Sequence, residues 1–250
     1  MNSSNFSLKD KTILITGASS GIGYCTAQIA ADHGANIIAV ARNEENLKKL
    51  IDSLPTGNHQ YIPTDITNAE ELASMVSKID KVDGIVHSAG IVELAPIRFI
   101  KADVMDRIRK TNYDAAIFLI QEVLKKKKIN KKSSIVLVSS ISGLFGMKGN
   151  GMYAGTKAAL IGIAKVMAHE LSSSGIRVNC VAPGMVRTEI TENTIKILSK
   201  EVVEADEAKY PLGYGDPEDV ANPIIFLLSS ASKWITGETI VVDGGRTSSI

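Results

Sequence analysis

Short apolar runs alternate with longer, helix-patterned stretches from one end of the chain to the other. Seven runs rich in β-branched residues have the length of strands: Thr12–Thr16, Asn36–Ala41, Gln60–Pro63, Gly84–His87, Ser134–Ser139, Arg177–Ala182 and Thr239–Val242. The stretches between them repeat apolar residues every three or four positions, as in Ile22–His33, Ala69–Ile79, Ala102–Lys126 and Tyr153–Leu171. This alternation predicts βαβ units and a parallel sheet. The runs lack polar positions at every second residue, which indicates that helices cover both faces of the sheet.

The alternation continues without an interdomain linker or an internal repeat. We therefore predict one α/β domain over residues 1–250, built on a doubly wound parallel sheet. One segment does not follow this alternation of strands and helices. Residues 185–211 are helical in pattern but poorly amphipathic, and they follow the turn at Pro183 and Gly184. We interpret this segment as a mobile flap over a substrate site.

Composition and charge exclude several classes of function. Lys and Arg total 28 against 27 Asp and Glu, so no overall field would attract nucleic acid or an anionic membrane. The start, Met1–Lys11, has no apolar signal region, and runs such as Ile224–Leu228 are too short to cross a bilayer. Cys25 and Cys180 stand in no metal-ligand spacing and are interpreted as reduced thiols. We expect a cytoplasmic protein that binds neither nucleic acid nor membrane.

A glycine-rich segment follows the first predicted strand and opens the first predicted helix. It reads Thr16-Gly17-Ala18-Ser19-Ser20-Gly21-Ile22-Gly23. Glycines let the backbone approach a pyrophosphate, and a helix N-terminus offers free N–H groups and the positive end of a dipole. A tight turn without a ligand is the alternative, but the position directly after a strand favours a dinucleotide. The predicted contacts are Gly17, Ser19, Ser20, Gly21, Ile22 and Gly23.

Four further polar residues occur in an order and spacing that are typical of a catalytic set. Tyr153 and Lys157 are four residues apart on a predicted helix and so share one face. Ser140 comes thirteen residues before Tyr153, at the end of the fifth strand, and Asn112 lies inside the preceding long helix. Each has an ordinary structural reading, because Tyr-x-x-x-Lys occurs by chance and Ser140 could cap a strand end. Their joint occurrence behind a dinucleotide loop favours a catalytic set.

The Gly-x-x-x-Gly-x-Gly spacing and these four residues together resemble the short-chain dehydrogenase/reductase family over almost the whole chain. The resemblance implies a Rossmann fold of seven strands with helices on both faces. It also implies an oxidoreductase that moves a hydride between a nicotinamide and a carbonyl or secondary alcohol, with ketone reduction as the expected direction. The implied catalytic residues are Asn112, Ser140, Tyr153 and Lys157.

Carbonyl reduction explains why these residue types are needed. A hydride must reach carbon and a proton must reach oxygen, and Tyr153 is the expected proton donor. Free tyrosine has a pKa of about 10, so we expect Lys157 and the oxidised nicotinamide to lower the pKa of Tyr153 by roughly three, about 4 kcal/mol. Ser140 would stabilise charge on the substrate oxygen. Asn112 would hold a water that supplies protons to Lys157.

The end of the second strand indicates the choice between NAD and NADP. An NAD enzyme usually places Asp or Glu there, but this chain has Ala41, followed by Arg42 and Asn43. A guanidinium can bind a 2′-phosphate bidentately, whereas a carboxylate would repel it. We predict that NADP(H) is preferred over NAD(H), with contacts from Arg42 and Asn43. The alternative is that Arg42 is a solvated residue at a helix start.

The remaining cofactor contacts rest on the resemblance alone. The family binds adenine after the third strand and the nicotinamide carboxamide after the sixth. A third segment resembles the family's Asn-Asn-Ala-Gly, with His87 and Ser88 in place of the asparagines, and we expect His87 to take over a backbone hydrogen bond. His33, His59 and His169 form no ligand pattern with His87, so we predict no metal site. The implied contacts are Asp65, Ile66, Ser88, Ala89, Gly90, Pro183, Gly184, Val186 and Thr188.

The sequence says less about the chemical class of the substrate than about the cofactor. The expected pocket wall is mostly apolar and suits an alkyl or acyl ketone better than a free sugar: Leu94, Leu144, Phe145, Met152, Met185 and Ile190. The β-ketoacyl carrier-protein reductases, which reduce an acyl thioester, are one alternative. The basic run Lys125–Lys128 with Lys131 and Lys132 could dock an acidic carrier, although a solvated helix end is the plainer reading. Ser174 stands where many such reductases have an arginine.

Two expectations concern the class of protein and its assembly. A catalytically silent NADP(H)-binding sensor is the alternative from another class, but such relatives usually lose the tyrosine or the lysine that this chain keeps. The resemblance also implies a homotetramer paired through the stretches Ala102–Lys126 and Tyr153–Leu171. Apolar residues such as Leu160, Ile163 and Met167 would need the cover of a neighbouring subunit.

Overall fold

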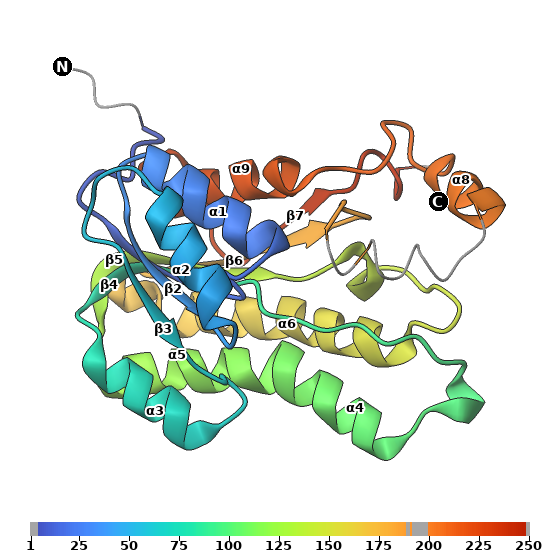
Figure 1. Cartoon of the computed structure of the whole chain (residues 1–250), viewed down its shortest axis with the longest axis horizontal. Coiled ribbons are helices and arrows are strands. Elements are labelled where there is room, and N and C mark those ends of the chain that lie inside the picture. The colour runs from blue at the N-terminus through green and yellow to red at the C-terminus, as the bar shows by residue number, and fades with distance from the viewer. Residues whose placement is uncertain (1–4, 189–190, 192–199, 249–250) are drawn as a thin grey trace.

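The computed structural model describes residues 5–188, 191 and 200–248, and it contains a seven-stranded parallel sheet (Figure 1). The strands are β1 Thr12–Thr16, β2 Asn36–Ala41, β3 Gln60–Pro63, β4 Val82–His87, β5 Ile129–Val138, β6 Arg177–Pro183 and β7 Thr239–Val242. Their order is β3-β2-β1-β4-β5-β6-β7, and every neighbouring pair is parallel. The chain therefore winds outward in both directions from β1 and β4. Ligands of such sheets bind in the crevice at this reversal point.

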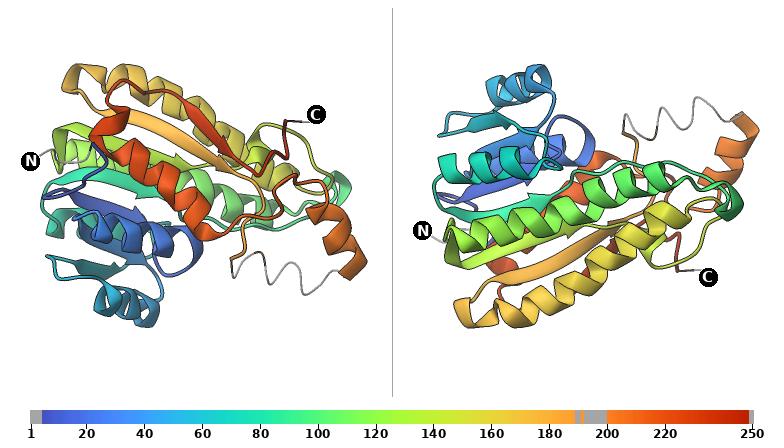
Figure 2. Two further views of the ribbon diagram at one scale, coloured as in Figure 1. Left: turned by 90° about the horizontal axis from the view of Figure 1, so that it is seen from above. Right: turned by 90° about the horizontal axis from the view of Figure 1, so that it is seen from below.

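Helices cover both faces of the sheet, as predicted (Figure 2). One face carries α1 Gly21–Asp32, α2 Glu44–Ser53 and α9 Pro217–Leu228, and the other carries α3 Ala69–Lys78, α4 Ala102–Arg109, α5 Ala115–Lys125 and α6 Gly151–Glu170. Successive strand residues enter opposite cores: Leu14 packs with α3 and α5, whereas Ile13 and Ile15 pack with α1 and α9. Both cores are apolar, which explains why the strands show no polar alternation.

The predicted long helix over Ala102–Lys126 is wrong in its middle. A π-helical turn, Lys110–Asp114, separates α4 from α5. Turns of this kind carry one extra residue and are frequent at functional sites. Here the turn contains Asn112, whose side chain is fully buried. The fifth strand also begins earlier than predicted, at Ile129, and its register against β4 shifts between Val82 and Gly84.

The predicted flap at 185–211 leaves the sheet after β6 and returns before α9. Its described part includes α8, Lys200–Glu207, while 189–190 and 192–199 lie outside the described residues. The two ends of the segment are held together by a parallel bridge between Val186 and Gly215. The backbone N–H of Arg187 donates to Gly215 at 2.8 Å, and its guanidinium donates to the carbonyl of Tyr214 at 2.7 Å. The base of the segment is therefore closed.

Candidate active site

A cavity of about 830 Å³ runs along the carboxyl edge of the sheet. Its wall is formed by the residues that directly follow β1, β2, β3, β4, β5 and β6, together with α6 and the start of the flap. Every predicted cofactor contact except Gly23 lies on this wall: Gly17, Ser19, Ser20, Gly21, Ile22, Arg42, Asn43, Asp65, Ile66, Ser88, Ala89, Gly90, Tyr153, Lys157, Pro183, Gly184, Val186 and Thr188. The fold thus brings segments that are far apart in the sequence to one elongated site.

The glycine-rich loop is shaped by close backbone contacts. Gly17 has φ +69°, and a Cβ there would lie 2.7 Å from the backbone N of Ala89. A Cβ on Gly23 would lie 2.4 Å from the carbonyl oxygen of Gly17. Gly23 therefore supports the loop from behind instead of lining the cavity, which corrects its predicted contact with the cofactor.

The N-terminus of α1 lacks the side-chain cap and the acidic first turn that α2 and α3 have, which leaves its backbone N–H groups for a ligand. Ser20 is the N-cap but its side chain makes no capping hydrogen bond, and the first turn contains no acidic residue. By contrast, Asn43 and Asn68 cap α2 and α3 with their side chains, and both first turns are acidic. The uncapped N–H groups and the dipole of α1 fit an anionic pyrophosphate.

The adenosine end of the cavity is charged. Arg42 is exposed directly after β2, and Asp65 lies across from it after β3. Hydrogen bonds from the side chain and backbone of Thr67, with a smaller contribution from the charge of Arg42, hold the pKa of Asp65 below its usual value. Arg42 is thus the positive side chain on this part of the described wall.

Ser140, Tyr153 and Lys157 meet where β5 ends against α6. Ser140 begins the 3₁₀ turn Ile141–Gly143, and its Oγ accepts a hydrogen bond from the backbone of Ser142 at 3.1 Å. A Cβ on Gly143 would lie 2.8 Å from the backbone of Lys157, so this turn lies directly on α6. The Nζ of Lys157 lies 5.5 Å from the centroid of the Tyr153 ring and donates to the carbonyl of Val138 at 2.7 Å.

The flanking serines have other partners. The Oγ of Ser139 donates to the carbonyl of Lys157 at 2.8 Å, which ties β5 to α6. The Oγ of Ser142 accepts from the side-chain amide of Asn150 at 2.8 Å. The hydroxyl of Ser140 donates weakly to the carbonyl of Pro183 at 3.5 Å, and its interaction with Tyr153 opposes the rise in the pKa of the phenol. The geometry therefore favours Ser140 for contact with a substrate oxygen.

Burial shifts the pKa values of Tyr153 and Lys157 in opposite directions. Burial raises the pKa of Tyr153 to about 12, although the hydrogen bond with Ser140 lowers it. Burial lowers the pKa of Lys157 to about 8. The sequence led us to expect a phenol pKa below 10 with the nicotinamide bound, whereas in the protein alone desolvation outweighs the hydrogen bond with Ser140 and the pKa lies above 10. Tyr153 therefore holds its proton at neutral pH.

Asn112 lies behind the cavity wall and is not part of it. Its side-chain oxygen accepts from the backbone N–H of Ile91 at 2.8 Å, and its amide donates to the carbonyl of Ile91 at 2.9 Å and to Oγ1 of Thr156 at 3.2 Å. The side-chain amide is therefore already paired within the protein, and the water predicted at Asn112 stays a prediction. Asn112 positions the segment after Gly90, which passes next to Lys157.

His87 is fully buried at the end of β4. Its Nδ1 lies 3.0 Å from the hydroxyl of Thr16 on the neighbouring strand, and a backbone hydrogen bond with Asn112, the kind of partner that was expected, opposes the fall in its pKa. Burial, with a smaller contribution from the charge of Lys157, lowers the pKa of His87 to about 3, so the imidazole is neutral. Within the described residues, no cluster of three or more His, Cys, Asp or Glu side chains could hold a metal ion.

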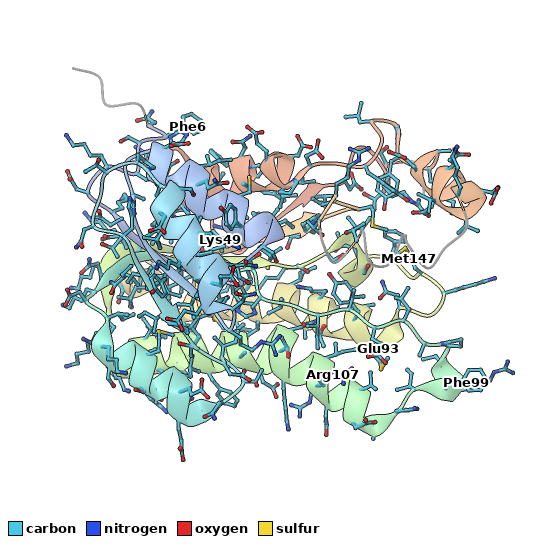
Figure 3. The ribbon with its side chains drawn as sticks, viewed as in Figure 1. Phe6, Lys49, Glu93, Phe99, Arg107 and Met147 are labelled. Carbon is cyan, nitrogen blue, oxygen red and sulfur yellow. The ribbon has the colours of Figure 1, made fainter. Side chains whose placement is uncertain are left out.

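The substrate end was predicted only in part. Leu94 and Met185 line the cavity, whereas Leu144, Phe145 and Met152 do not, and Ile190 lies outside the described residues. Met152 packs instead in a small core with α4. The sequence reasoning missed several lining residues, namely Arg107, Thr111, Met147, Asn150 and Tyr210. The spacing of Arg107 and Thr111, one helical turn apart, was a usable signal, and Figure 3 shows Arg107 beside its ion-pair partner Glu93.

The basic run at Lys125–Lys132 lies at the opposite edge of the sheet, where β5 begins. The Nζ of Lys126 donates to the carbonyl of Ala73 at 2.7 Å, and that of Lys128 donates to the carbonyl of Ile79 at 2.6 Å. These lysines therefore satisfy carbonyls at the end of α3, which supports the plainer structural reading. A carrier docked on them would be far from the cavity mouth.

Comparison with known proteins assigns the class. A family model described as enoyl-(acyl carrier protein) reductase matches residues 17–247. A short-chain type dehydrogenase/reductase from Mycobacterium ulcerans superposes with a TM-score of 0.88 at 32% identity, covering 96% of this chain and 90% of that one. A dehydrogenase/reductase from Sinorhizobium meliloti 1021 gives a TM-score of 0.90 at 27% identity, with 98% of both chains covered. The chain belongs to the short-chain dehydrogenase/reductase family and is an oxidoreductase that uses a nicotinamide cofactor on a carbonyl or CH–OH group.

Two relatives with more specific names are also similar over nearly their whole length. The 3-oxoacyl-[acyl-carrier-protein] reductase FabG of Rickettsia bellii is 38% identical over 239 residues, covering 95% of this chain and 97% of the relative. That of Thermotoga maritima is 36% identical over 246 residues, covering 95% and 98%. The predicted family and Rossmann fold are thus confirmed. No helix among the described residues is long and apolar enough to cross a membrane.

Proposed function

We propose that this enzyme reduces the 3-oxo group of an acyl thioester with NADPH, with Tyr153 as proton donor. The observation that carries the proposal is the grouping of Ser140, Tyr153 and Lys157 on the wall of the same cavity as the glycine-rich loop. The names of the two curated relatives support a 3-oxoacyl thioester over other carbonyls. NADPH consumption with 3-oxoacyl thioesters, compared with simple ketones and free sugars, tests the proposal. Failure to turn over any thioester would contradict it.

Each residue has a defined task in this proposal. The neutral phenol of Tyr153 donates its proton to the substrate oxygen, and the hydroxyl of Ser140 hydrogen-bonds the same oxygen as charge develops on it. Lys157 binds the ribose beside the nicotinamide and holds a positive charge near Tyr153. When bound, the nicotinamide supplies the hydride. Asn112 positions the segment at Gly90 and Ile91 that closes this part of the cavity.

The cofactor and location follow from separate observations. Arg42 and Asn43 on the cavity wall favour NADP(H) over NAD(H), because no carboxylate follows β2 to repel a 2′-phosphate. Both cysteines, Cys25 and Cys180, are free, which fits a reducing compartment, and we propose a cytoplasmic location. A carrier protein, where one presents the thioester, would have to approach the carboxyl edge of the sheet.

Removing the guanidinium of Arg42 tests the cofactor preference. Arg42→Ala should weaken NADPH binding about tenfold or more and leave NADH binding unchanged, because only NADPH offers a phosphate for a charge-assisted hydrogen bond. Titration by nucleotide fluorescence measures both affinities. Lys49→Ala is the matched control, because Lys49 is an exposed cation on α2 already paired with Glu45 at 2.7 Å (Figure 3). Equal or tighter binding of NADH by the wild type would reject the preference.

We also propose that the enzyme is a homotetramer, as the family resemblance implies. Two of the three residues first offered as needing cover do not need it, since Leu160 is fully buried within the subunit and Met167 is 7% exposed, whereas Ile163 is partly buried. The large apolar side chains that these two stretches do expose are Met105 on α4, Phe118 on α5 and Val166 on α6, at 51%, 49% and 47%. Light scattering at micromolar concentration should show four subunits. A stable monomer under those conditions would rule the assembly out.

A further inference from the structure

The segment after β7 returns to the substrate end of the molecule and is tightly held there. The carbonyl of Gly244 accepts from the backbone of Leu212 at 3.0 Å, and a Cβ on Gly245 would lie 3.0 Å from the ring of Pro211. Both carboxylate oxygens of Asp243 accept hydrogen bonds from this turn, including 2.8 Å from the backbone of Thr247. The turn is therefore a rigid base for the next side chain, Arg246.

Arg246 lies against two aromatic rings, of which Tyr210 lines the cavity and Phe145 does not. Its Cζ is 5.2 Å from the centroid of Phe145 and 5.8 Å from that of Tyr210. Phe145 belongs to the turn that begins at Ser140, and Tyr210 lines the cavity next to the base of the flap. A guanidinium held against ring faces keeps its N–H groups in a fixed plane, which prepares it for a planar, bidentate partner.

The acidic side chains around Arg246 are already engaged. Asp243 is saturated by its own turn, and Glu207 accepts from the guanidinium of Arg187 at 2.8 Å. Asp206 accepts from the hydroxyl of Tyr214 at 2.9 Å and pairs with Lys209 at 3.1 Å. Within the part of the chain that the structure describes, Arg246 has no carboxylate within 4.0 Å. Among the described residues, the positive charge of Arg246 therefore has no ion-pair partner, and it stands next to Tyr210 at the substrate end of the cavity.

We propose that Arg246 binds a phosphate on the arm of the acyl thioester and so selects substrates that carry one. This inference rests on the proposed function, because it assigns the handle by which that substrate is recognised. Phosphate suits a preorganised guanidinium better than a neutral group does, since two parallel charge-assisted hydrogen bonds can form. The position beside Phe145 and Tyr210, and not on the wall around Tyr153, places the contact on the arm and away from the reacting carbonyl.

Two substrates that differ only in the phosphate give the sharpest test: acetoacetyl-4′-phosphopantetheine and acetoacetyl-pantetheine, each at saturating NADPH. Arg246→Gln should raise KM for the phosphorylated thioester about tenfold, leave its kcat unchanged, and leave both constants for the other thioester unchanged. Arg246→Lys should restore part of the difference. Lys209→Gln, which removes an adjacent charge already paired with Asp206, should change neither substrate. Added salt should reduce the wild-type preference.

The other outcomes are distinct. Equal losses on both thioesters would show that Arg246 only packs Phe145 and Tyr210, and would overturn the inference. So would an unchanged preference in Arg246→Gln. If the wild type turns over neither thioester, the proposed function itself fails, whereas turnover of both with an unaltered preference rejects only the role of Arg246.

Discussion

Tyr153→Phe should lower kcat/KM by at least about 10²–10⁴-fold while NADPH still binds normally. The substitution removes one hydroxyl and little packing, and general acid catalysis is worth about that range in rate. Burial raises the pKa of Tyr153 to about 12, so the free enzyme carries the proton to be transferred throughout the neutral range.

Steady-state turnover and nucleotide fluorescence measure the two halves of this expectation. Tyr24→Phe is the matched control, because it removes a hydroxyl from a partly buried tyrosine on α1 that does not line the cavity, and its turnover should stay near that of the wild type. Normal turnover in Tyr153→Phe on a substrate that the wild type accepts would show that another acid must be found. A wild type that binds NADPH and turns over no carbonyl would instead favour the sensor alternative.

The sequence predicted the sheet well because its signal is redundant. Each central strand, such as Ile13–Ile15, is buried on both faces, so apolar runs and the intervening helical periods all indicate the same architecture. The position of the expected cofactor contacts could be predicted equally well, because residues that follow parallel strands lie at the carboxyl edge of the sheet regardless of side-chain type. Position in the fold, and not the chemistry of each residue, explains why the sheet was predicted correctly and why the predicted contacts lie on one cavity wall.

The features that failed depend on contacts that a linear pattern does not contain. Apolar spacing across Ala102–Lys126 continues through the π-helical turn, so nothing in it shows that Asn112 turns inward to pair with Ile91. The wall residues Leu144 and Met152 were chosen by proximity in sequence to Ser140 and Tyr153. Helical geometry then directs Met152 into a separate core, and a turn leaves Leu144 48% exposed.

The pKa of Tyr153 in the protein alone differs from the value expected with the nicotinamide bound for another reason. The argument from the sequence counted the attraction of an ammonium and the positive nicotinamide, and both favour the phenolate. Desolvation could not be judged before the burial around Tyr153 and Lys157 was known. In the protein alone, desolvation dominates both groups and moves their pKa values in opposite directions.

Lys157→Met should abolish most turnover and yet change stability in a pH-dependent way. Burial lowers the pKa of Lys157 from 10.5 to about 8, which corresponds to about 3 kcal/mol. Below pH 8 the folded protein carries this buried charge at full cost. Between pH 8 and 10.5 the unfolded chain retains the proton that the folded protein releases, so this group makes the free energy of unfolding rise with pH. Above 10.5 the lysine is neutral in both states and the cost is gone.

Methionine keeps the length of the side chain and removes the charge at every pH. The free energy of unfolding of Lys157→Met minus that of the wild type should therefore be largest near pH 7 and fall by about 3 kcal/mol between pH 8 and 10.5. Loss of the hydrogen bond to Val138 offsets part of the gain at all pH values but does not alter this slope. Urea unfolding across the range measures it, with Lys165→Met, an exposed lysine on the same helix, as the control. A difference that does not change with pH would mean that Lys157 keeps its charge in the folded protein up to pH 10.5, and that burial is not what tunes this site.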